Sequence, residues 1–244
     1  MVSIITITYN AEKWIETTMR SVLSQTNTDY EYLIIDGASK DNTVAIARQL
    51  EPDFRGRLRI YSEPDDGLYY AMNKGLHLAK GDFVWFMNAG DQIFAPETLQ
   101  QIADQIKPDV DIVYGKASIV NAQGVKVSEH HKKTPEHLTR RSLLNGLVVS
   151  HQAILVRRAI AMDYDTRYRI TADYDWVVKC VTVSRGNMYL DEYLCKFLTD
   201  GVSAKQRKRA WIERYKIMRQ QYGLVQTLVA HLLIVIKYPF SIKY

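Results

Sequence analysis

Short apolar runs alternate with amphipathic segments along the first hundred residues of the chain. The runs are rich in β-branched residues and bounded by turn residues, which predicts strands at Val2–Tyr9, Tyr32–Ile35, Leu58–Tyr61 and Phe83–Met87. Between them, apolar positions recur at helical spacing and predict helices that begin near Asn10, Val44, Leu68 and Pro96. This alternation predicts an α/β fold with a mainly parallel, doubly wound sheet and right-handed crossovers.

The run Phe83–Met87 is the centre of this pattern. Its five consecutive apolar residues indicate a strand buried on both faces, as in the middle of a parallel sheet. Asn88, Ala89, Gly90 and Asp91 follow it, at the carboxyl end where open α/β sheets bind ligands. An ordinary glycine-containing turn is the alternative reading of these four residues, and the ends of the other strands decide between the two.

The pattern changes after residue 108. We predict a strand at Val110–Tyr114 and a hairpin formed by Lys116–Asn121 and Val125–Ser128. Farther along, the pattern predicts helices at Leu138–Leu144 and Tyr174–Val181 and strands at Gln152–Val156 and Met188–Phe197. Because no linker divides the chain, we predict one domain over residues 1–200, with halves at 1–107 and 108–200, followed by a tail over residues 201–244.

Composition and charge narrow the range of partners. The 244 residues are 47% hydrophobic and 24% charged, which is typical of a globular chain and not of a disordered one. The net charge is +5, but residues 201–244 hold nine Lys or Arg and one acid, so this tail carries +8 and the first 200 residues carry the remaining −3. A basic tail on a slightly acidic body indicates a local anionic partner and no general binding of nucleic acid.

The cysteines and the first residues of the chain indicate the cellular compartment in which the protein is expected. Cys180 and Cys195 lie in apolar runs without the spacing of metal ligands, so we expect buried free thiols in a reducing compartment. The chain begins with Val2-Ser3-Ile4-Ile5 after its methionine, without a basic segment ahead of an apolar one. We therefore predict no signal peptide and a cytoplasmic protein.

Polar residues stand at the ends of three predicted strands. Asn10 follows the first strand, Asp36 the second, and Asn88 with Asp91 the fourth. Carboxyl ends of parallel strands share one edge, so these side chains are expected at one cleft, where a carboxylate accepts hydrogen bonds from a ribose hydroxyl or a base N–H. Asp91 is also a candidate ligand of Mg²⁺ or Mn²⁺. Asp41 is better explained as the N-cap of the second helix.

Four segments, in this order, resemble family 2 glycosyltransferases, and most closely the bacterial enzymes that build exopolysaccharide, capsule or lipopolysaccharide. They are Thr6–Asn10, Ile34–Thr43, Ser62–Gly75 and Phe86–Asp91. The match extends over residues 1–200, and the four segments together are specific although each alone is weak. The resemblance implies a GT-A type, Rossmann-like fold and inverting transfer of a sugar from a nucleotide diphosphate sugar. The absence of both Gly-x-Gly-x-x-Gly and a Walker phosphate loop disfavours dehydrogenases and kinases.

The resemblance implies that the first half of the chain binds the donor. Asp36 matches the aspartate that binds the donor's base, and Tyr9 and Asn10 line the same pocket. Asp65, with the turn at Gly67, matches the region that approaches the nucleotide and the sugar. The full set of expected donor-binding residues is Thr8, Tyr9, Asn10, Asp36, Ser39, Asp65, Asn73, Lys74, Asn88, Ala89 and Gly90.

The metal motif of the family is altered in this chain. That motif is usually Asp-x-Asp, and here the usual position of the metal-binding carboxylate falls on Gly90. We expect Asp91 to substitute as the ligand of Mg²⁺ or Mn²⁺, or else that the metal binds weakly or not at all.

The resemblance implies that the catalytic base lies in Ala172–Trp176, on Asp173. Inversion needs a carboxylate on the face opposite the leaving diphosphate, where it takes the proton of the acceptor hydroxyl. The alternative is that Asp173 is only the N-cap of the helix that follows, and the two roles can coexist. His151 and Gln152 resemble a family position near the donor phosphates or the acceptor, with a structural histidine as the alternative.

The tail has its own pattern. One stripe of a predicted helix carries Trp211, Tyr215, Met218 and Tyr222. The apolar run Leu224–Ile236 that follows is shorter than the roughly 20 residues that span a bilayer. We therefore predict that residues 201–244 attach to the cytoplasmic membrane face, helped by anionic lipid near their basic residues. The alternative is a helix packed on the domain or in a homodimer interface.

Taken together, the sequence predicts an inverting glycosyltransferase at the inner face of the cell membrane. Its donor is a nucleotide diphosphate sugar, and its acceptor is a lipid-linked glycan or an oligosaccharide of the bacterial surface. Two alternatives stay open, namely a nucleotidyltransferase with a similar sheet and a non-catalytic partner subunit with the same fold. Retention of Asp173 and Asp91 argues against the non-catalytic subunit.

Overall fold

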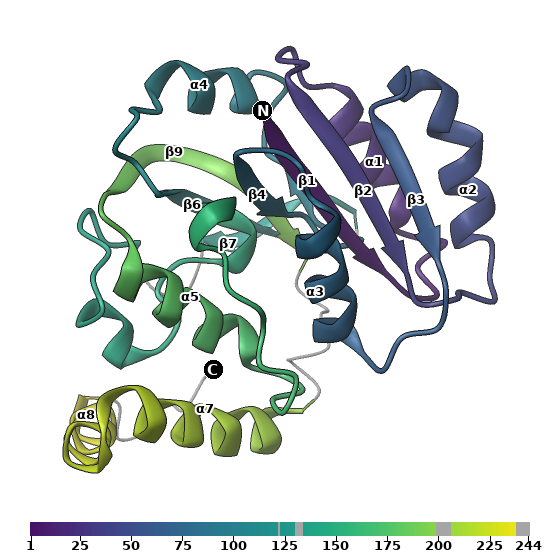
Figure 1. Cartoon of the computed structure of the whole chain (residues 1–244). Helices are drawn as coiled ribbons and strands as arrows, with labels where there is room; N and C mark the ends of the chain where they lie inside the picture. Colours follow the sequence, from purple (N-terminus) through teal and green to yellow (C-terminus); the bar gives the residue numbers. More distant parts are fainter. Residues whose placement is uncertain (122, 130–133, 199–205, 238–244) are drawn as a thin grey trace.

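A single mixed sheet forms the centre of the computed structural model, which describes residues 1–121, 123–129, 134–198 and 206–237 (Figure 1). The strands follow the order β3-β2-β1-β4-β8-β6-β9-β5, and β7 pairs with β6. Their bounds are β1 Val2–Thr8, β2 Tyr30–Asp36, β3 Leu58–Ser62, β4 Phe83–Phe86, β5 Gln92–Ile93, β6 Ile112–Val120, β7 Lys126–Glu129, β8 Ile154–Arg157 and β9 Asn187–Leu198. The α-helices are α1 Ile15–Leu23, α2 Thr43–Leu50, α3 Leu68–Leu78, α4 Thr98–Gln105, α5 Ala172–Val183, α7 Arg207–Tyr222 and α8 Leu224–Lys237.

The first half of the sheet is parallel, as the sequence predicts. β1 pairs in parallel with β2 on one side and with β4 on the other, and every residue of these three strands is buried. Because the order runs β3-β2-β1-β4, right-handed crossovers put α1 and α2 on one face and α3 on the other, which Figure 1 shows. This arrangement brings the ends of β1, β2 and β4 to one edge.

The second half of the sheet is mixed, a detail that the predicted mainly parallel sheet did not specify. β8 runs antiparallel to both β4 and β6, and β9 runs parallel to β6. The strand predicted at Val110–Tyr114 and the first arm of the predicted hairpin are one strand, β6, whose pairing with β9 shifts register at Gly115. A Cβ atom at Gly115 would lie 2.8 Å from the carbonyl oxygen of Glu192, so only glycine allows this approach.

Three local predictions also need correction. The helix expected at Leu138–Leu144 is only a 3₁₀ turn at Ser142–Asn145. The short strand β5 had no counterpart in the prediction, because two residues are too few to show a period. The N-cap of α2 is Asn42 and not Asp41, although the Asp41 carboxylate does accept a hydrogen bond from the Thr43 N–H at 3.0 Å.

One continuous core joins the two halves of the chain. At its centre, the indole of Trp176 from α5 stacks on Tyr164, with ring centroids 4.9 Å apart, and meets Phe86 of β4 edge-on. Trp85 of β4 donates its indole N–H to the carbonyl oxygen of Gln152. These contacts fix α5 and the segment before it against the central strand of the sheet.

The C-terminal helices lie below α5 in Figure 1. α7 packs on the domain through Glu213, Ile217 and Met218, all buried, whereas Trp211 is 49% exposed. The predicted stripe is therefore only partly the buried face. No helix among the described residues is long and apolar enough to cross a membrane. Residues 201–205 and 238–244 of the predicted tail lie outside the described residues.

Candidate active site

Strained backbone marks the ends of β1 and β2. Asn10, just after β1, has φ +48°, and Ala38, just after β2, has φ +58°. Left-handed backbone is unfavourable for residues with a Cβ, and such strain concentrates at functional sites. The two turns are bonded to each other, because the Asn10 N–H donates to Ser39 Oγ at 2.8 Å and the Lys40 N–H donates to Asn10 Oδ1 at 2.9 Å.

Asp36 lies at the end of β2 with its side chain buried. Its Oδ2 accepts hydrogen bonds from the Ser39 N–H at 2.9 Å and from Ser62 Oγ at 2.7 Å, and its Oδ1 accepts one from Ser39 Oγ. The carboxylate is thus held rigidly by two serines. Each of its oxygens can still accept from a further donor, such as the N–H of a base.

Tyr9 and Asp65 meet over Gly37. A Cβ atom at Gly37 would lie 2.7 Å from Asp65 Oδ2 and 3.3 Å from the Tyr9 ring, so these two side chains come against the backbone of the second strand end. Asp65 Oδ1 accepts the Gly67 N–H at 2.8 Å, which fixes the turn before α3. Tyr9 is 62% exposed, and its ring lies against Gly37, the residue that follows Asp36.

Two buried polar atoms at this edge have no hydrogen-bond partner in the described part of the chain. They are Thr8 Oγ1, at the end of β1, and Asn88 Oδ1, after β4. β1 and β4 are neighbours, and the ladder continues past β4 through the bond from the Ala89 N–H to the Ile7 carbonyl oxygen. Buried polar groups are nearly always satisfied, so an unpartnered pair at adjacent strand ends points to a ligand.

Asp173 occupies the first turn of α5 and is partly exposed. One carboxylate oxygen accepts the Tyr174 N–H at 2.8 Å and lies 3.4 Å from the hydroxyl of Tyr69, which is on α3. Burial raises the pKa of Asp173 to about 6, and the hydrogen bonds that it accepts only partly offset this. A carboxylate poised near neutral pH suits a general base. The N-cap residue is Thr171, so Asp173 is not the cap itself.

Asp175 points the other way from Asp173. It is fully buried, its Oδ2 lies 2.6 Å from Lys179 Nζ, and its Oδ1 accepts a hydrogen bond from the Gln221 amide at 2.7 Å. Both partners belong to the packing of α5 on α7. Both oxygens of this carboxylate therefore contact groups of the fold, one on α5 itself and one on α7.

We call the edge formed by the residues that follow β1, β2 and β4 the donor edge, and residues 169–173 the base segment, after the roles expected for them from the sequence; the two are bonded to each other. The Arg169 guanidinium donates to the Asp66 carbonyl oxygen, and the Tyr69 hydroxyl donates to the Ile170 carbonyl oxygen at 2.9 Å. Asp66 adjoins Asp65, which lies over the end of β2. The loop that approaches the donor edge is thus connected directly to the loop that presents Asp173.

Comparisons with known proteins identify the family to which this chain belongs. Residues 3–165 match the pattern of "Glycosyl transferase family 2". The chain belongs to glycosyl transferase family 2. A "PGL/p-HBAD biosynthesis glycosyltransferase" of Mycobacterium bovis is 33% identical over 186 residues, which cover 74% of this chain and 69% of the relative. The "putative teichuronic acid biosynthesis glycosyltransferase TuaG" of Bacillus subtilis is 27% identical. The match covers 93% of this chain and 94% of TuaG.

Solved structures share the fold. TarS 1-349 of S. aureus in complex with UDP-GlcNAc superposes with a TM-score of 0.72 at 22% identity, covering 98% of this chain and 73% of TarS 1-349. The mannosyltransferase PcManGT of Pyrobaculum calidifontis, in complex with GDP-Man and Mn²⁺, superposes with a TM-score of 0.65 at 17% identity. The match covers 98% of this chain and 75% of the PcManGT chain. The protein is therefore a glycosyltransferase of GT-A-like fold, which sets the nucleotidyltransferase and non-catalytic alternatives aside.

A metal site of this glycosyltransferase would have to be built around Asp91, and the residues present do not fit one. Asp91 is buried, its Oδ1 accepts the Leu198 N–H at 3.0 Å, and burial raises its pKa to about 7. Gly90 has φ +107° and abuts the Leu198 side chain. Among the residues that the structure describes, no three His, Cys, Asp or Glu lie together as a metal group would require. No step below passes through a metal.

Several other predicted site residues of the glycosyltransferase form contacts with other parts of the protein. Both amide atoms of Asn73 are bonded to the backbone of Tyr164, at 3.0 and 2.7 Å, and Lys74 pairs with Glu63 at 2.6 Å. These contacts give Asn73 a structural part in joining α3 to the segment before α5.

His151 and Gln152 are also buried in the core. The His151 Nε2 lies 2.7 Å from the Tyr164 hydroxyl, and burial lowers the pKa of the ring to about 4, so the ring is neutral. Gln152 Oε1 accepts from Ser150 Oγ at 3.0 Å. This geometry favours the structural histidine over a phosphate contact.

Sequence reasoning missed three residues that shape the site. They are Ser62, Tyr69 and Glu213, which hold Asp36, Asp173 and the segment before Asp173, respectively. Ser62 and Tyr69 fall inside the segment Ser62–Gly75 that carries the family resemblance, so a signal was present for both. Glu213 had none beyond being a lone acid in a basic tail.

Proposed function

We propose that this glycosyltransferase inverts the anomeric centre of its donor sugar, with Asp173 as the catalytic base and Asp36, Thr8 and Asn88 at the donor. The observation that carries the proposal is the bonded connection between the donor edge and the base segment, through Arg169 to Asp66. It supports a site in which the donor's anomeric carbon and an acceptor hydroxyl come together beside Asp173. TarS 1-349, which shares the fold, was solved with UDP-GlcNAc bound, and a nucleoside diphosphate sugar is the donor class proposed here.

The reaction follows from these positions. The Asp173 carboxylate removes the proton of the acceptor hydroxyl while that oxygen attacks the anomeric carbon from the face opposite the diphosphate. A carbon–oxygen bond to the acceptor forms, the bond from the anomeric carbon to the diphosphate oxygen breaks, and the nucleoside diphosphate leaves with the electron pair. Because a diphosphate is already a good leaving group, no second acid from the protein is required.

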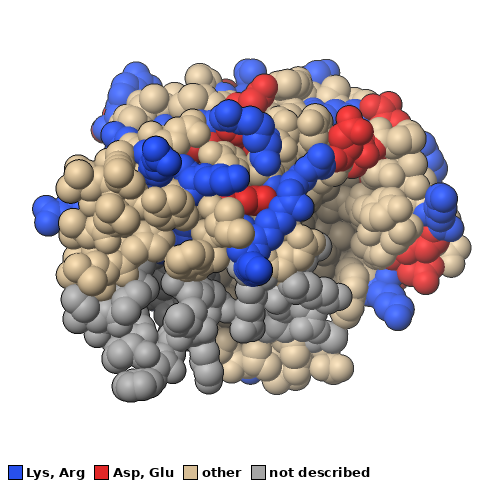
Figure 2. All heavy atoms as spheres, turned by 90° about the horizontal axis from the view of Figure 1, so that it is seen from below, with Lys and Arg blue, Asp and Glu red and all other residues tan. Residues whose placement is uncertain are grey.

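We propose that the acceptor is a lipid-linked glycan and that the protein works on the inner face of the cell membrane. The apolar side of α8 supports this, because Val225, Leu228, Leu232 and Leu233 are each more than half exposed. Figure 2 looks onto the face of α7 and α8, where Lys and Arg gather. A groove of about 690 Å³ on α7 is lined by four cations and one acid, namely Arg167, Lys208, Arg209, Lys216 and Glu213. Apolar and basic side chains together are what an anionic lipid surface binds.

Activity is tested by the product. Purified protein is incubated with UDP-GlcNAc and with GDP-mannose, each with and without Mn²⁺, in the presence of bacterial lipid extract. The proposal predicts release of UDP or GDP and a glycolipid whose new linkage has the configuration opposite to that of the donor. Release of the nucleoside monophosphate or retention of configuration would contradict it.

Membrane attachment is tested by vesicle flotation. The variant Leu228→Gln/Leu232→Gln is compared with Val125→Gln/Val127→Gln, which changes two equally exposed valines on the hairpin and serves as the control. Wild type and control are expected to float with phosphatidylglycerol vesicles, and to do so less at high salt. The α8 variant is expected to remain in the bottom fraction, unbound. Failure of the wild type to float, or a dimer that dissociates only in the α8 variant, would favour a protein interface instead.

A further inference from the structure

Glu213 is the one acid among residues 201–244, yet it does not face solvent. It lies on α7, only 6% exposed, and points at the backbone of the segment that precedes α5. The acidic side chain is therefore turned inward in a helix whose surface is basic. Burial of a charge is costly unless the charge is fully hydrogen-bonded, so its contacts call for an explanation.

Three consecutive backbone amides donate to this carboxylate. Glu213 Oε2 accepts the Ile170 N–H at 2.9 Å, the Arg169 N–H at 3.1 Å and the Thr171 N–H at 3.2 Å. Oε1 accepts the Arg169 N–H at 3.0 Å and Arg209 Nε at 2.9 Å. Burial alone would raise the pKa of Glu213, but these hydrogen bonds outweigh it and lower the pKa, so the group is anionic at neutral pH.

The segment that Glu213 holds leads straight into the catalytic turn. Thr171 is the N-cap of α5 and Asp173 is in its first turn, so fixing residues 169–171 fixes where α5 begins. The same segment is tied on its other side, through Arg169 to Asp66 and through the Ile170 carbonyl oxygen to Tyr69. Removing Glu213 would leave these amides without their acceptor and free the segment on the α7 side.

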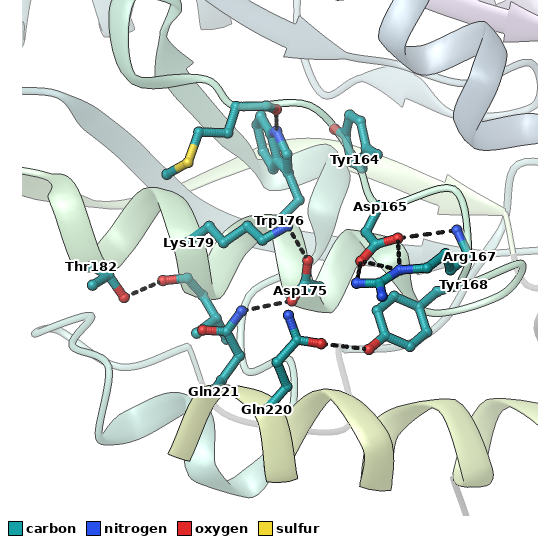
Figure 3. Close-up of polar contacts among 12 residues, drawn as sticks. Tyr164, Asp165, Arg167, Tyr168, Asp175, Trp176, Lys179, Thr182, Gln220 and Gln221 are labelled. Atoms are coloured by element: carbon teal, nitrogen blue, oxygen red, sulfur yellow. Dashed lines mark hydrogen bonds and ion pairs between the residues drawn. The ribbon is translucent and has the colours of Figure 1, made fainter. Parts of the chain in front are cut away.

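A second contact of α7, this one with α5 itself, makes it possible to test the docking of α7 separately from the positioning of residues 169–171. Figure 3 shows Gln221 of α7 reaching Asp175 of α5, and Gln220 reaching Tyr168. The Gln221–Asp175 bond, at 2.7 Å, docks α7 on α5 but does not touch residues 169–171. Loss of Gln221 therefore weakens docking alone, whereas loss of Glu213 also releases the segment that carries the base.

We propose that Glu213, from the C-terminal tail, is a positioning residue for the catalytic carboxylate: by binding the amides of residues 169–171 it sets the place of Asp173 against the donor edge. The proposal rests on the proposed function, because it takes Asp173 as the base. It also makes α7 part of the catalytic unit and not only a connection to α8.

The position of Glu213 has a consequence for pH dependence. The groups that face Asp173 are Tyr69 of α3, Tyr164 before α5 and Glu213 of α7. Burial raises the pKa of Asp173, and the negative charge of Glu213 adds in the same direction. The base works deprotonated, so activity rises with pH through the pKa of Asp173. Removing the charge at Glu213 should move this rise to lower pH.

The test compares Glu213→Gln, Glu213→Asp and Gln221→Ala with wild type. Amide hydrogen exchange of residues 169–173, release of UDP from UDP-GlcNAc or of GDP from GDP-mannose, and the pH profile of kcat are measured on each. We expect Glu213→Gln to speed exchange at 169–171 at least about tenfold and to lower kcat by about ten- to a hundredfold, because small displacements of a reacting group are costly. Donor KM should stay within about twofold, and the rise of kcat with pH should move downward.

The other two variants decide the outcome. Gln221→Ala is expected to lower Tm but to leave kcat and the pH profile unchanged, and Glu213→Asp, which keeps the charge, should retain the wild-type pH profile at a reduced kcat. Equal kcat and equal pH profiles in Glu213→Gln and Gln221→Ala would overturn the proposal. If Glu213→Gln does not fold, a Glu213→Asp variant with wild-type kcat and exchange would overturn it. Full turnover in Asp173→Asn would instead refute the proposed function and leave the exchange result as a separate finding.

Discussion

The donor edge and the base segment are built in opposite ways. At the donor edge, the residues directly follow buried strands of one sheet: Asn10 and Ala38 have left-handed backbone there, and Asp36 is bonded to Ser39 in its own turn and to Ser62 at the end of the neighbouring strand β3. The base segment is held by distant residues instead. Its amides bind Glu213, more than 40 residues farther along the chain. On the other side, the Ile170 carbonyl oxygen accepts from Tyr69 of α3, and Arg169 donates to Asp66 in the loop before α3.

This difference has a mechanistic meaning. A proposed donor site made from the ends of neighbouring strands of a rigid sheet is formed before any ligand arrives, which favours tight binding of the nucleotide. A base in the first turn of α5 depends on how α3 and α7 hold the segment before that helix, so turnover should be more sensitive to distant substitutions than nucleotide affinity is. We therefore expect that substitutions at the base segment change turnover while those at the donor edge change affinity. The following predictions sharpen this contrast.

The largest effect is expected at Asp173. Asp173→Asn keeps the size of the side chain and removes its basicity, so turnover should fall by about 10²–10⁴, the usual worth of a general base. In wild type, turnover should rise with pH through about 6, because burial raises the pKa of Asp173 to that value and only the deprotonated form accepts the proton.

Asp175→Asn is the matched comparison two residues away. It is expected to lower Tm, because a buried ion pair with Lys179 is broken, while kcat changes by less than about tenfold. Nucleoside diphosphate release and thermal denaturation of both variants provide the measurement. Normal turnover in Asp173→Asn beside a dead Asp175→Asn would show that the wrong carboxylate was assigned.

Next in size is the pH dependence of stability at Asp91. Its folded pKa of about 7 lies above the ordinary 3.8, so the fold favours the neutral form and stability is lost as pH rises between these values. Asp91→Asn should therefore be more stable than wild type at pH 8, by up to about 4 kcal/mol, and about equal to it near pH 4. Denaturation at both pH values, with and without Mn²⁺, checks this. A variant that is less stable at pH 8 only when Mn²⁺ is present would restore Asp91 as a metal ligand.

A smaller effect is expected for Asp36, at the donor edge. Asp36→Ala removes an acceptor at the end of β2 and strands the hydroxyl groups of Ser39 and Ser62, so binding of the nucleoside diphosphate should weaken by about 1–3 kcal/mol. Calorimetric titration with UDP and with GDP measures the change. Unaltered affinity for whichever nucleotide binds would remove Asp36 from the site.

The smallest expected effect is at Asn88. Its Oδ1 has no hydrogen-bond partner among the residues that the structure describes, so Asn88→Ala should cost the fold almost nothing. Loss of a hydrogen bond to the donor should weaken nucleotide binding by about 1 kcal/mol. The combination of an unchanged Tm and a weaker affinity distinguishes a ligand contact from a structural one, and a fall in Tm with no loss of affinity would show the reverse.

The same contrast explains what the sequence could predict. β1, β2 and α1 were predicted because periodicity is local, and Asp36 and Asn88 could be proposed as site residues because they stand next to buried strands. The direction of β8 could not be predicted, since a strand of three apolar residues and Arg157 pairs equally well either way until β4 and β6 are in place. The roles of Asp175 and Glu213 depend on contacts between α5 and α7, and no spacing within either helix indicates them.

The most direct test of the separation between donor edge and base is the nucleotide affinity of Asp173→Asn. UDP and GDP are titrated by calorimetry into this variant and into wild type, and the release of nucleoside diphosphate is measured on the same preparations. The account predicts that the variant binds the nucleotide as tightly as wild type, within about twofold, while its turnover falls at least about a hundredfold. Loss of nucleotide affinity together with turnover would contradict it, because Asp173 would then belong to the donor site.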